Sequence, residues 1–219
     1  MKRLVIAIDG PSGAGKGTIS RTLSETLGYR HVDTGAMYRA VGWMALLERI
    51  PLEDEAAVAA LAQRAAIVVE GGVVSIDGHD VTRAIRTPEI DKAATAVARL
   101  PRVREVLVAR QRALGVEGGV VMEGRDIGTV VFPNADLKIY LDASAEERAR
   151  RRASDPAHSG SQAGQAAVAA AIQARDTSDT TRSVSPLTLA ADAVHIDTTS
   201  MPITEVVAKV LSLVRAKQL

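Results

Sequence analysis

The sequence predicts an α/β protein in which a parallel sheet carries helices on both faces, and three observations lead to this fold class. Short apolar runs alternate along the chain with segments of helical periodicity, as expected for strands joined by crossover helices. A glycine-rich turn connects the first run to the first helix. Acidic residues stand where four strands are expected to end, namely Asp9, Asp33, Glu123 and Asp142. Ligands of such sheets bind outside the carboxyl ends of the strands.

The first third of the chain predicts two core strands and three helices. Gly28 gives the first helix a C-terminal signal, Asp33 or Thr34 can cap the second helix, and Asp54 can cap the third. The strands are expected at 4–8 and just before Asp33, and the helices at 19–27, from about 34 to 49 and from about 55 to 65.

The next segment changes character and predicts a small antiparallel unit. Two short strands, 66–70 and 73–76, flank the turn pair Gly71-Gly72, and a third strand can follow Asp77-Gly78. Both pairs are strong hairpin signals. We therefore expect an inserted subdomain over about 66–100, within an otherwise alternating α/β pattern.

The second half returns to alternating strands and helices. Ser144 and Glu147 have capping-box spacing, and the helix they open carries several arginines between Arg148 and Arg152. The residues 153–164 are rich in Ser, Gly and Ala, which predicts a mobile loop. The expected strands are 120–122, 137–141 and 194–197, and the expected helices are 88–99, 101–114, the one opened at Ser144, 165–175 and 203–216.

Bulk properties exclude several functional classes. The 219 residues suffice for one α/β core with an insertion, and a composition of 47% hydrophobic and 24% charged residues is ordinary for a soluble globular protein. A net charge of +1 and 2% aromatic residues argue against a nucleic-acid partner. The chain has no cysteine, no apolar stretch near the roughly 18 residues of a membrane span, and no heptad seam. We expect a cytoplasmic protein that is monomeric and has no membrane partner.

The glycine-rich turn predicts a polyphosphate site. Its pattern Gly-x-x-x-x-Gly-Lys lies between a strand and a helix, which is the context in which this motif carries meaning. Glycines let successive backbone N–H groups point inward, while the helix N-terminus and the lysine add positive charge. The residues of this glycine-rich loop that would hold the polyphosphate are Gly10, Pro11, Ser12, Gly13, Ala14, Gly15, Lys16, Gly17 and Thr18.

Gly17 stands where most such loops place a hydroxyl that binds Mg²⁺. The ending Gly-Lys-Gly-Thr resembles nucleoside monophosphate kinases. Mg²⁺ usually keeps several waters and is held together with substrate phosphates. We therefore expect few direct protein ligands for Mg²⁺ and name Thr18 as the candidate.

Arginines at loops and helix starts suggest a second phosphate-bearing substrate. Phosphoryl transfer depends on positioning and on charge stabilisation, and the planar guanidinium fork of arginine fits phosphate oxygens. A surface role is the alternative for Arg148 to Arg152, since charged helix faces are common. Arg125 is less open to that alternative, because it follows a core strand directly. The groups are Arg39, Arg125, Arg148 to Arg152, and Arg175 with Arg182.

At this point the chain resembles the bacterial cytidylate kinase family. The resemblance spans nearly the whole chain, and its most specific motif is the run 124–133, Gly-Arg-Asp-Ile-Gly-Thr-Val-Val-Phe-Pro. It implies a P-loop kinase fold with an inserted nucleotide-binding subdomain and a mobile lid. It also implies the reaction of ATP with CMP or dCMP to give ADP and CDP or dCDP, with Mg²⁺. The other motifs are 9–18, 33–39, 101–104 and 175–182.

The resemblance also implies roles for individual residues. Lys16 would contact the donor phosphates, and Arg152 in the lid would reach the transferring phosphate. Together with Arg125, these two are the catalytic candidates. The residues implied for CMP are Thr34, Arg104 and Asp126 on the cytosine, Arg39, Arg125 and Arg182 on the phosphate, Thr95, Arg175 and Asp179 on the pentose, and Tyr38 beside them.

Elementary chemistry supports the assignment of the base contacts. A carboxylate such as Asp126 accepts a hydrogen bond from the N4 amine of cytosine, and Arg104 can donate to the O2/N3 side. Uracil would lose both contacts, at a cost of about 1–3 kcal/mol for each buried group left unpaired. No general base is needed, because the attacking phosphate oxygen is already ionised. We give no catalytic role to His31, His79, His158 or His195.

Two alternatives stay open at the level of sequence. A guanine-nucleotide switch would carry an Asn-Lys-x-Asp element, which the chain lacks. A small P-loop kinase for uridylate, shikimate or gluconate would keep the loop without needing Arg104 and Asp126. With the cytidylate kinase resemblance, 1–219 forms one kinase domain. Its expected parts are a core (about 1–35, 101–147 and 176–219), a CMP-binding insertion (about 36–100) and a lid (about 148–175).

Overall fold

The computed structural model describes residues 2–155 and 164–218. Most of the predicted loop at 153–164 lies outside the described residues, as do His158 and the central part of the predicted lid. The boundaries of the three expected parts therefore stay a prediction.

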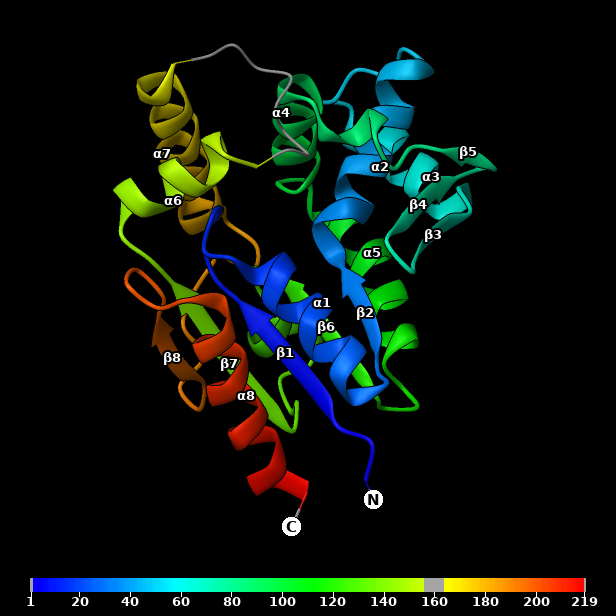
Figure 1. Ribbon diagram of the computed structural model, residues 1–219. Coiled ribbons are helices and arrows are strands. Elements are labelled where there is room, and N and C mark those ends of the chain that lie inside the picture. The colour runs from blue at the N-terminus through cyan, green and yellow to red at the C-terminus, as the bar shows by residue number, and fades with distance from the viewer. Residues whose placement is uncertain (1, 156–163, 219) are drawn as a thin grey trace.

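Five parallel strands form the central sheet, in the order β2-β6-β1-β7-β8. Apolar side chains alternate between its two faces, since successive residues of a strand point to opposite sides. Ile6 and Ile8 pack against α1 and α8 on one face, whereas Ala7 packs with Val108 of α5 on the other. Figure 1 shows α1 and α8 in front of the sheet and α5 behind it. The strands are β1 (Val5–Asp9), β2 (Arg30–Asp33), β6 (Val120–Gly124), β7 (Leu137–Asp142) and β8 (Val194–Asp197), and the helices are α1 (Lys16–Leu27), α5 (Pro101–Leu114) and α8 (Ile203–Gln218).

The predicted fold class is confirmed for the parallel sheet, its two helical layers and the small antiparallel sheet. This second sheet is formed by β3 (Ile67–Glu70), β4 (Val73–Ile76) and β5 (His79–Asp80). The register of the central sheet places Asp9 beside Gly124 and Asp33 beside Glu123, so the carboxyl ends of three strands are level. The functional residues expected at these ends can therefore meet.

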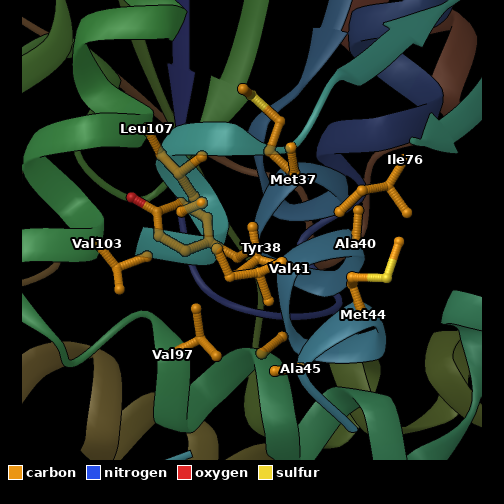
Figure 2. Close-up of a cluster of buried hydrophobic side chains, with 14 of the residues drawn as sticks. Met37, Tyr38, Ala40, Val41, Met44, Ala45, Ile76, Val97, Val103 and Leu107 are labelled. Carbon is orange, nitrogen blue, oxygen red and sulfur yellow. The ribbon is translucent and has the colours of Figure 1, made fainter. Parts of the chain in front are cut away.

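A second hydrophobic core lies between the small sheet and four helices. It joins α2 (Thr34–Leu47), α3 (Glu55–Arg64) and α4 (Pro88–Val97) to α5. Figure 2 shows the Tyr38 ring among the apolar side chains of this core, with its hydroxyl on the side of Val103 and Leu107. The side chains of Asp33 and Asp54 accept hydrogen bonds from the N–H groups of Ala36 (3.1 Å) and Ala57 (3.0 Å), so the capping residue of α2 is Asp33.

Helices α6 (Ala145–Ala153) and α7 (Gln165–Thr181) pack against each other above the carboxyl ends of the sheet (Figure 1). The predicted capping box of α6 is half formed. Ser144 Oγ accepts from the N–H of Glu147 (3.2 Å), but the N–H of Ser144 donates to Thr199, and the Glu147 carboxylate binds Arg150 and Arg151 instead.

Four elements differ from the sequence prediction. Helix α7 was expected to end at 175 and continues to Thr181, because Asp176 and Asp179 are held by arginines outside the helix. Helix α1 begins at Lys16, inside the glycine-rich loop, and not at residue 19. A π-helix, η2 (Ile127–Val131), follows β6, and a 3₁₀ turn, η1 (Ala84–Arg86), precedes α4. Neither was foreseen.

Candidate active site

A cavity of about 710 Å³ opens at the carboxyl ends of β1, β2 and β6. Its volume lies within the range of about 300–1,000 Å³ that is usual for small-molecule sites. All of the residues predicted to bind nucleotide line it, except Gly10 and Pro11. Those lining it are Ser12, Gly13, Ala14, Gly15, Lys16, Gly17, Thr18, Thr34, Tyr38, Arg39, Thr95, Arg104, Arg125, Asp126, Arg152, Arg175, Asp179 and Arg182.

The wall of the cavity is strongly cationic. Among the described residues, ten Lys and Arg side chains but only six Asp and Glu side chains line it. Nearby walls of low polarisability strengthen the field of such an excess. A site of this kind favours polyanionic ligands. Arg150 and Arg151, from the predicted group Arg148 to Arg152, also line the cavity. Sequence analysis missed several other wall residues, including Arg86 from η1, Met201 and Pro202 just before α8, and Ile203 at its start.

The glycine-rich loop takes a conformation that only glycine tolerates at two points. Gly10 and Gly13 have positive φ angles of 148° and 80°. A Cβ atom at Gly10 would lie 2.0 Å from the carbonyl oxygen of Leu141, and one at Gly13 would lie 2.8 Å from that of Arg148. The loop therefore packs directly on β7 and α6, and its shape is fixed by close backbone contact.

Lys16 is the cation of this loop, and its side chain folds back over it. The ammonium donates to the carbonyl oxygens of Gly10 (2.8 Å) and Pro11 (2.7 Å). These two residues thus hold Lys16 without lining the cavity. Burial, and then the nearby charge of Arg125, lowers the pKa of Lys16 to about 7. An anion in the cavity would restore the charged form, because an opposite charge favours it.

The two helices α6 and α7 hold the same loop from outside. Arg148 donates from Nη1 to the carbonyl oxygen of Ser12 (3.1 Å) and from Nε to that of Ala143 (3.0 Å), and it pairs with Asp176. The N–H of Ser12 donates to the Asp176 carboxylate (3.3 Å). The sequence suggested a phosphate or surface role for Arg148. Its observed contacts give it the task of supporting the loop.

Only two of the four strand-end acids face the cavity. Asp33 and Glu123 line it, whereas Asp9 and Asp142 do not. The carboxylate of Asp9 accepts the N–H groups of Ile127 (2.8 Å) and Gly128 (2.7 Å), which start η2. Burial raises the pKa of Asp9 to about 6, against the effect of these two hydrogen bonds. Asp9 therefore anchors the segment that carries Arg125 and Asp126, which the sequence pattern did not reveal.

Arg104, Asp126 and Arg182 form a buried charged cluster at one end of the cavity. Arg104 Nη2 donates to Asp126 Oδ2, and Arg182 Nη2 lies 3.5 Å from Asp126 Oδ1. The guanidinium carbon of Arg104 lies 5.6 Å from the centre of the Tyr38 ring. Arg104 is 2% exposed and Asp126 is 6% exposed. All three residues also line the cavity, so the cluster offers it both a carboxylate and guanidinium donors.

Other predicted residues are already hydrogen-bonded in the structure. Arg125 Nε donates to Asp179 Oδ2 (2.7 Å), and the hydroxyl of Thr34 donates to the carbonyl oxygen of Glu123 (2.7 Å). The hydroxyl of Thr95 donates within its own helix to Asp91. The Thr34 and Thr95 oxygens thus keep free lone pairs, and each can accept a hydrogen bond from a ligand.

Three arginines of the cavity wall carry buried nitrogen atoms without a hydrogen-bond partner, namely Arg104 Nε, Arg175 Nε and Arg182 Nη2. A buried polar atom without a partner is costly, at roughly 1–3 kcal/mol. Such atoms are satisfied when a ligand or water supplies acceptors. Their concentration around one cavity indicates a ligand rich in oxygen atoms.

Glu123 and Thr18 line the cavity beside Gly17, at the position that the sequence analysis considered for magnesium. A Cβ atom at Gly17 would lie 3.5 Å from Glu123 Oε1, so the carboxylate lies beside the residue that lacks a hydroxyl. Glu123 also lies 2.9 Å from His31 Nε2. Within residues 2–155 and 164–218, no group of three or more His, Cys, Asp and Glu side chains could hold a metal. This donor set fits a hydrated Mg²⁺ that is held mainly by phosphates.

The parallel sheet, the glycine-rich loop and the cationic cavity at the strand ends define a P-loop kinase. Solved structures share this fold at low identity. A gluconokinase from Sinorhizobium meliloti 1021 superposes with a TM-score of 0.54 and 16% identity, over 100% of this chain and 96% of that chain. A shikimate kinase from Acinetobacter baumannii gives 0.51 and 15%, over 99% and 96%.

Within this class, the chain belongs to the cytidylate kinase family. The family model for cytidylate kinase matches residues 6–216. A cytidylate kinase of Desulfitobacterium hafniense is 49% identical over 99% of this chain and 94% of its own length, and one of Pelotomaculum thermopropionicum is 50% identical over 96% of each. The resemblance drawn from the motifs is thereby confirmed. In the described part of the chain, we find no helix with the length and apolar character to cross a membrane.

Proposed function

We propose that the protein transfers the γ-phosphoryl group of ATP to CMP or dCMP, giving ADP and CDP or dCDP, in pyrimidine nucleotide metabolism. Family membership supports this activity. The observation that carries it is the buried Arg104–Asp126 pair, which faces the same cavity as the glycine-rich loop. The glycine-rich loop thus suits a polyphosphate. The Arg104–Asp126 pair suits a base that, like cytosine, carries an amine donor next to a hydrogen-bond acceptor.

The donor ATP occupies the side of the cavity formed by the glycine-rich loop. Ser12 to Thr18 surround its phosphates, Gly10 and Pro11 complete the loop outside the cavity, and Lys16 turns from the carbonyls of these two residues toward the phosphates. Mg²⁺ accompanies the nucleotide and supplies additional positive charge for the phosphates. Thr18 and Glu123 provide the protein oxygens for the ion and its waters, as their positions beside Gly17 permit.

The acceptor CMP occupies the opposite side. Arg39, Arg125 and Arg182 bind its phosphate. Arg182 Nη2 has no hydrogen-bond partner and lies 3.5 Å from Asp126 Oδ1, so it can still donate to a phosphate oxygen, which supports this placement. Asp126 accepts from the N4 amine of cytosine and Arg104 donates to the O2/N3 side, with Thr34 as a further acceptor. Thr95, Arg175 and Asp179 contact the pentose, and Tyr38 supports Arg104 through its ring.

Transfer follows from positioning and charge. The attacking oxygen belongs to a phosphate that is ionised at neutral pH, so no side chain has to remove a proton. Lys16, Arg125 and Arg152 are the catalytic residues in this proposal, because each places a cation beside the cavity where negative charge accumulates in transfer. Closure of the lid, predicted over about 148–175, would exclude water as a competing acceptor.

A coupled assay of ADP release tests the proposal against its rivals. CMP, dCMP, UMP, AMP, shikimate and gluconate are offered with ATP and Mg²⁺. We expect turnover with CMP or dCMP at a kcat/KM at least about tenfold above that for UMP, as one lost buried hydrogen bond would give. Turnover of another acceptor in place of CMP and dCMP would overturn the assignment. A monomeric state, a cytoplasmic location and the absence of a nucleic-acid partner stay predictions.

A further inference from the structure

One carboxylate, which was not among the predicted site residues, binds three arginines that were. Asp91 of α4 accepts at Oδ1 from Arg39 Nε (3.1 Å), Arg39 Nη2 (3.0 Å) and Arg175 Nη1 (3.3 Å). Its Oδ2 accepts from Arg152 Nη2. The arginines belong to α2, α6 and α7, so a single side chain of α4 connects three other helices.

The carboxylate lies behind these arginines as seen from the cavity. Arg39, Arg152 and Arg175 line the cavity, but Asp91 does not. Asp91 engages the Nε/Nη2 edge of Arg39 and a single Nη atom of each of the other two. A guanidinium has five N–H donors, so each arginine keeps donors for a ligand. Asp91 is therefore placed to support the arginines. A carboxylate that competed with the ligand for them would have to line the cavity, and Asp91 does not.

The three cations need such a counter-charge. Burial alone would raise the pKa of Asp91, but Arg39, Arg175 and Arg152 together hold it well below its usual range, so Asp91 is ionised. Burial and the charge of Arg39 both act to lower the pKa values of Arg152 and Arg175. The contribution of Arg39 reflects the repulsion between its guanidinium and those of Arg152 and Arg175. Without Asp91, like charges would move apart, and a shift of about 1 Å can cost a hundredfold in rate.

We propose that Asp91 is a positioning residue for phosphoryl transfer, which holds Arg39, Arg152 and Arg175 in the arrangement that receives the phosphate groups. The inference rests on the proposed function, because it assigns these arginines to the phosphates and pentose of the substrates. It adds that α6 and α7 are coupled to α4 through this one carboxylate. Loss of Asp91 therefore displaces all three arginines together, although they belong to three different helices.

Two variants test the inference, Asp91→Asn and Asp91→Ala, with Glu89→Gln as the matched control. Glu89 is an exposed acid on the same helix, so its variant removes one charge without touching the cluster. We expect kcat with CMP to fall about tenfold or more in Asp91→Asn and further in Asp91→Ala. KM for ATP should change less than about twofold, because Asp91 does not contact the glycine-rich loop, and Glu89→Gln should match the wild type.

The split between kcat and KM separates this role from others. A purely structural role would lower the melting temperature but leave kcat per folded molecule unchanged, and that result would overturn the inference. A role as competitor would lower KM for CMP in Asp91→Ala at unchanged kcat, which would also overturn it. If Asp91→Ala does not fold, the isosteric Asp91→Asn decides. An inactive wild type refutes the proposed function, whereas an active wild type with unaffected Asp91 variants refutes the inference alone.

Discussion

Arg104 and Asp126 show how much of the proposed specificity depends on single residues. They are buried, they pair with each other, and Arg182 stabilises the same carboxylate. The pair would present a fixed order of acceptor and donor groups to a base. Because cytosine and uracil differ in that order at their Watson–Crick edge, two side chains can separate them.

We expect Asp126→Asn to lower kcat/KM for CMP by about 10- to 100-fold while changing that for UMP much less. The amide keeps the shape but offers an N–H₂ group that favours the O4 oxygen of uracil, and a charged hydrogen bond contributes about 1.5–3 kcal/mol. Competition between CMP and UMP in one assay measures the ratio independently of the folded fraction. An unchanged ratio would contradict the assignment of Asp126 to the base.

Lys16 gives a prediction that depends on pH. Its pKa is lowered to about 7 without nucleotide, so at pH 8 the amine is mostly neutral in the free protein. Phosphates at the glycine-rich loop raise this pKa again, so binding should take up more than about half a proton near pH 8 and less as the pH falls below 7. Calorimetry of a non-hydrolysable ATP analogue with Mg²⁺, in two buffers of different ionisation enthalpy, measures this uptake.

The control for that measurement is Lys16→Arg, whose side chain stays protonated throughout. If proton uptake persists in Lys16→Arg, or is absent from the wild type, the titrating group is not Lys16.

At the level of elements, the short π-helix η2 positions the acceptor side of the cavity. Its hydrogen bonds run from Val131 N–H and Phe132 N–H to the carbonyl oxygens of Asp126 (3.1 Å) and Ile127 (2.7 Å). Asp9 fixes its first turn from the end of β1. The central strand thus sets both the glycine-rich loop, which follows Asp9, and the segment that carries Arg125 and Asp126.

We expect Asp9→Asn to lower the free energy of unfolding by about 1–3 kcal/mol. The amide nitrogen cannot accept a hydrogen bond, so one buried N–H of Ile127 or Gly128 loses its partner. Urea denaturation measures the effect. Asp142→Asn is the matched control. This strand-end carboxylate is partly exposed, and its hydrogen bond within the described residues comes from the N–H of the neighbouring Ala143, so the cost should stay below about 0.5 kcal/mol. Equal costs for the two variants would contradict the anchoring role of Asp9.

At the level of the whole molecule, the cavity joins parts of the chain that lie far apart in sequence. Its wall combines the ends of the central strands with α2, α4, α6 and α7. Ion pairs in the wall and behind it connect these parts, namely Arg125–Asp179, Arg152–Asp91 and Arg148–Asp176. Substrates bound between the parts should therefore stabilise the fold as a unit.

We expect CMP and a non-hydrolysable ATP analogue to raise the melting temperature each alone and further together. A ligand at 100 times its Kd adds about 2.7 kcal/mol to the folded state, which is roughly 5–10 °C for a chain of this length. Differential scanning fluorimetry with either ligand and with both measures the shifts. A shift with both ligands no larger than the larger single shift would argue against simultaneous binding in one cavity.

The sequence predicted the fold class and about half of the residues that line the cavity. Apolar runs identified the strands, the glycine-rich loop identified Ser12 to Thr18, and the arginine motifs together with the family resemblance identified wall residues between Thr34 and Arg182. It missed Asp91 and the role of Asp9, since neither lies in a recognisable motif of its own. It also ended α7 too early, because the polar residues near Asp176 favour caps and turns unless tertiary partners hold them.

The sequence by itself indicated what kind of substrates the protein takes. The Gly-x-x-x-x-Gly-Lys loop predicted a polyphosphate site from its local pattern, and the Gly-Arg-Asp run carried the family resemblance that implied an acceptor nucleotide. Only the tertiary structure decided which charges meet. Asp91 lies 52 residues from Arg39 and 61 from Arg152, and Asp9 lies 118 residues from Ile127. Such pairings depend on how helices pack over the sheet, and Coulomb energies depend on the final distances and burial, which no linear pattern records.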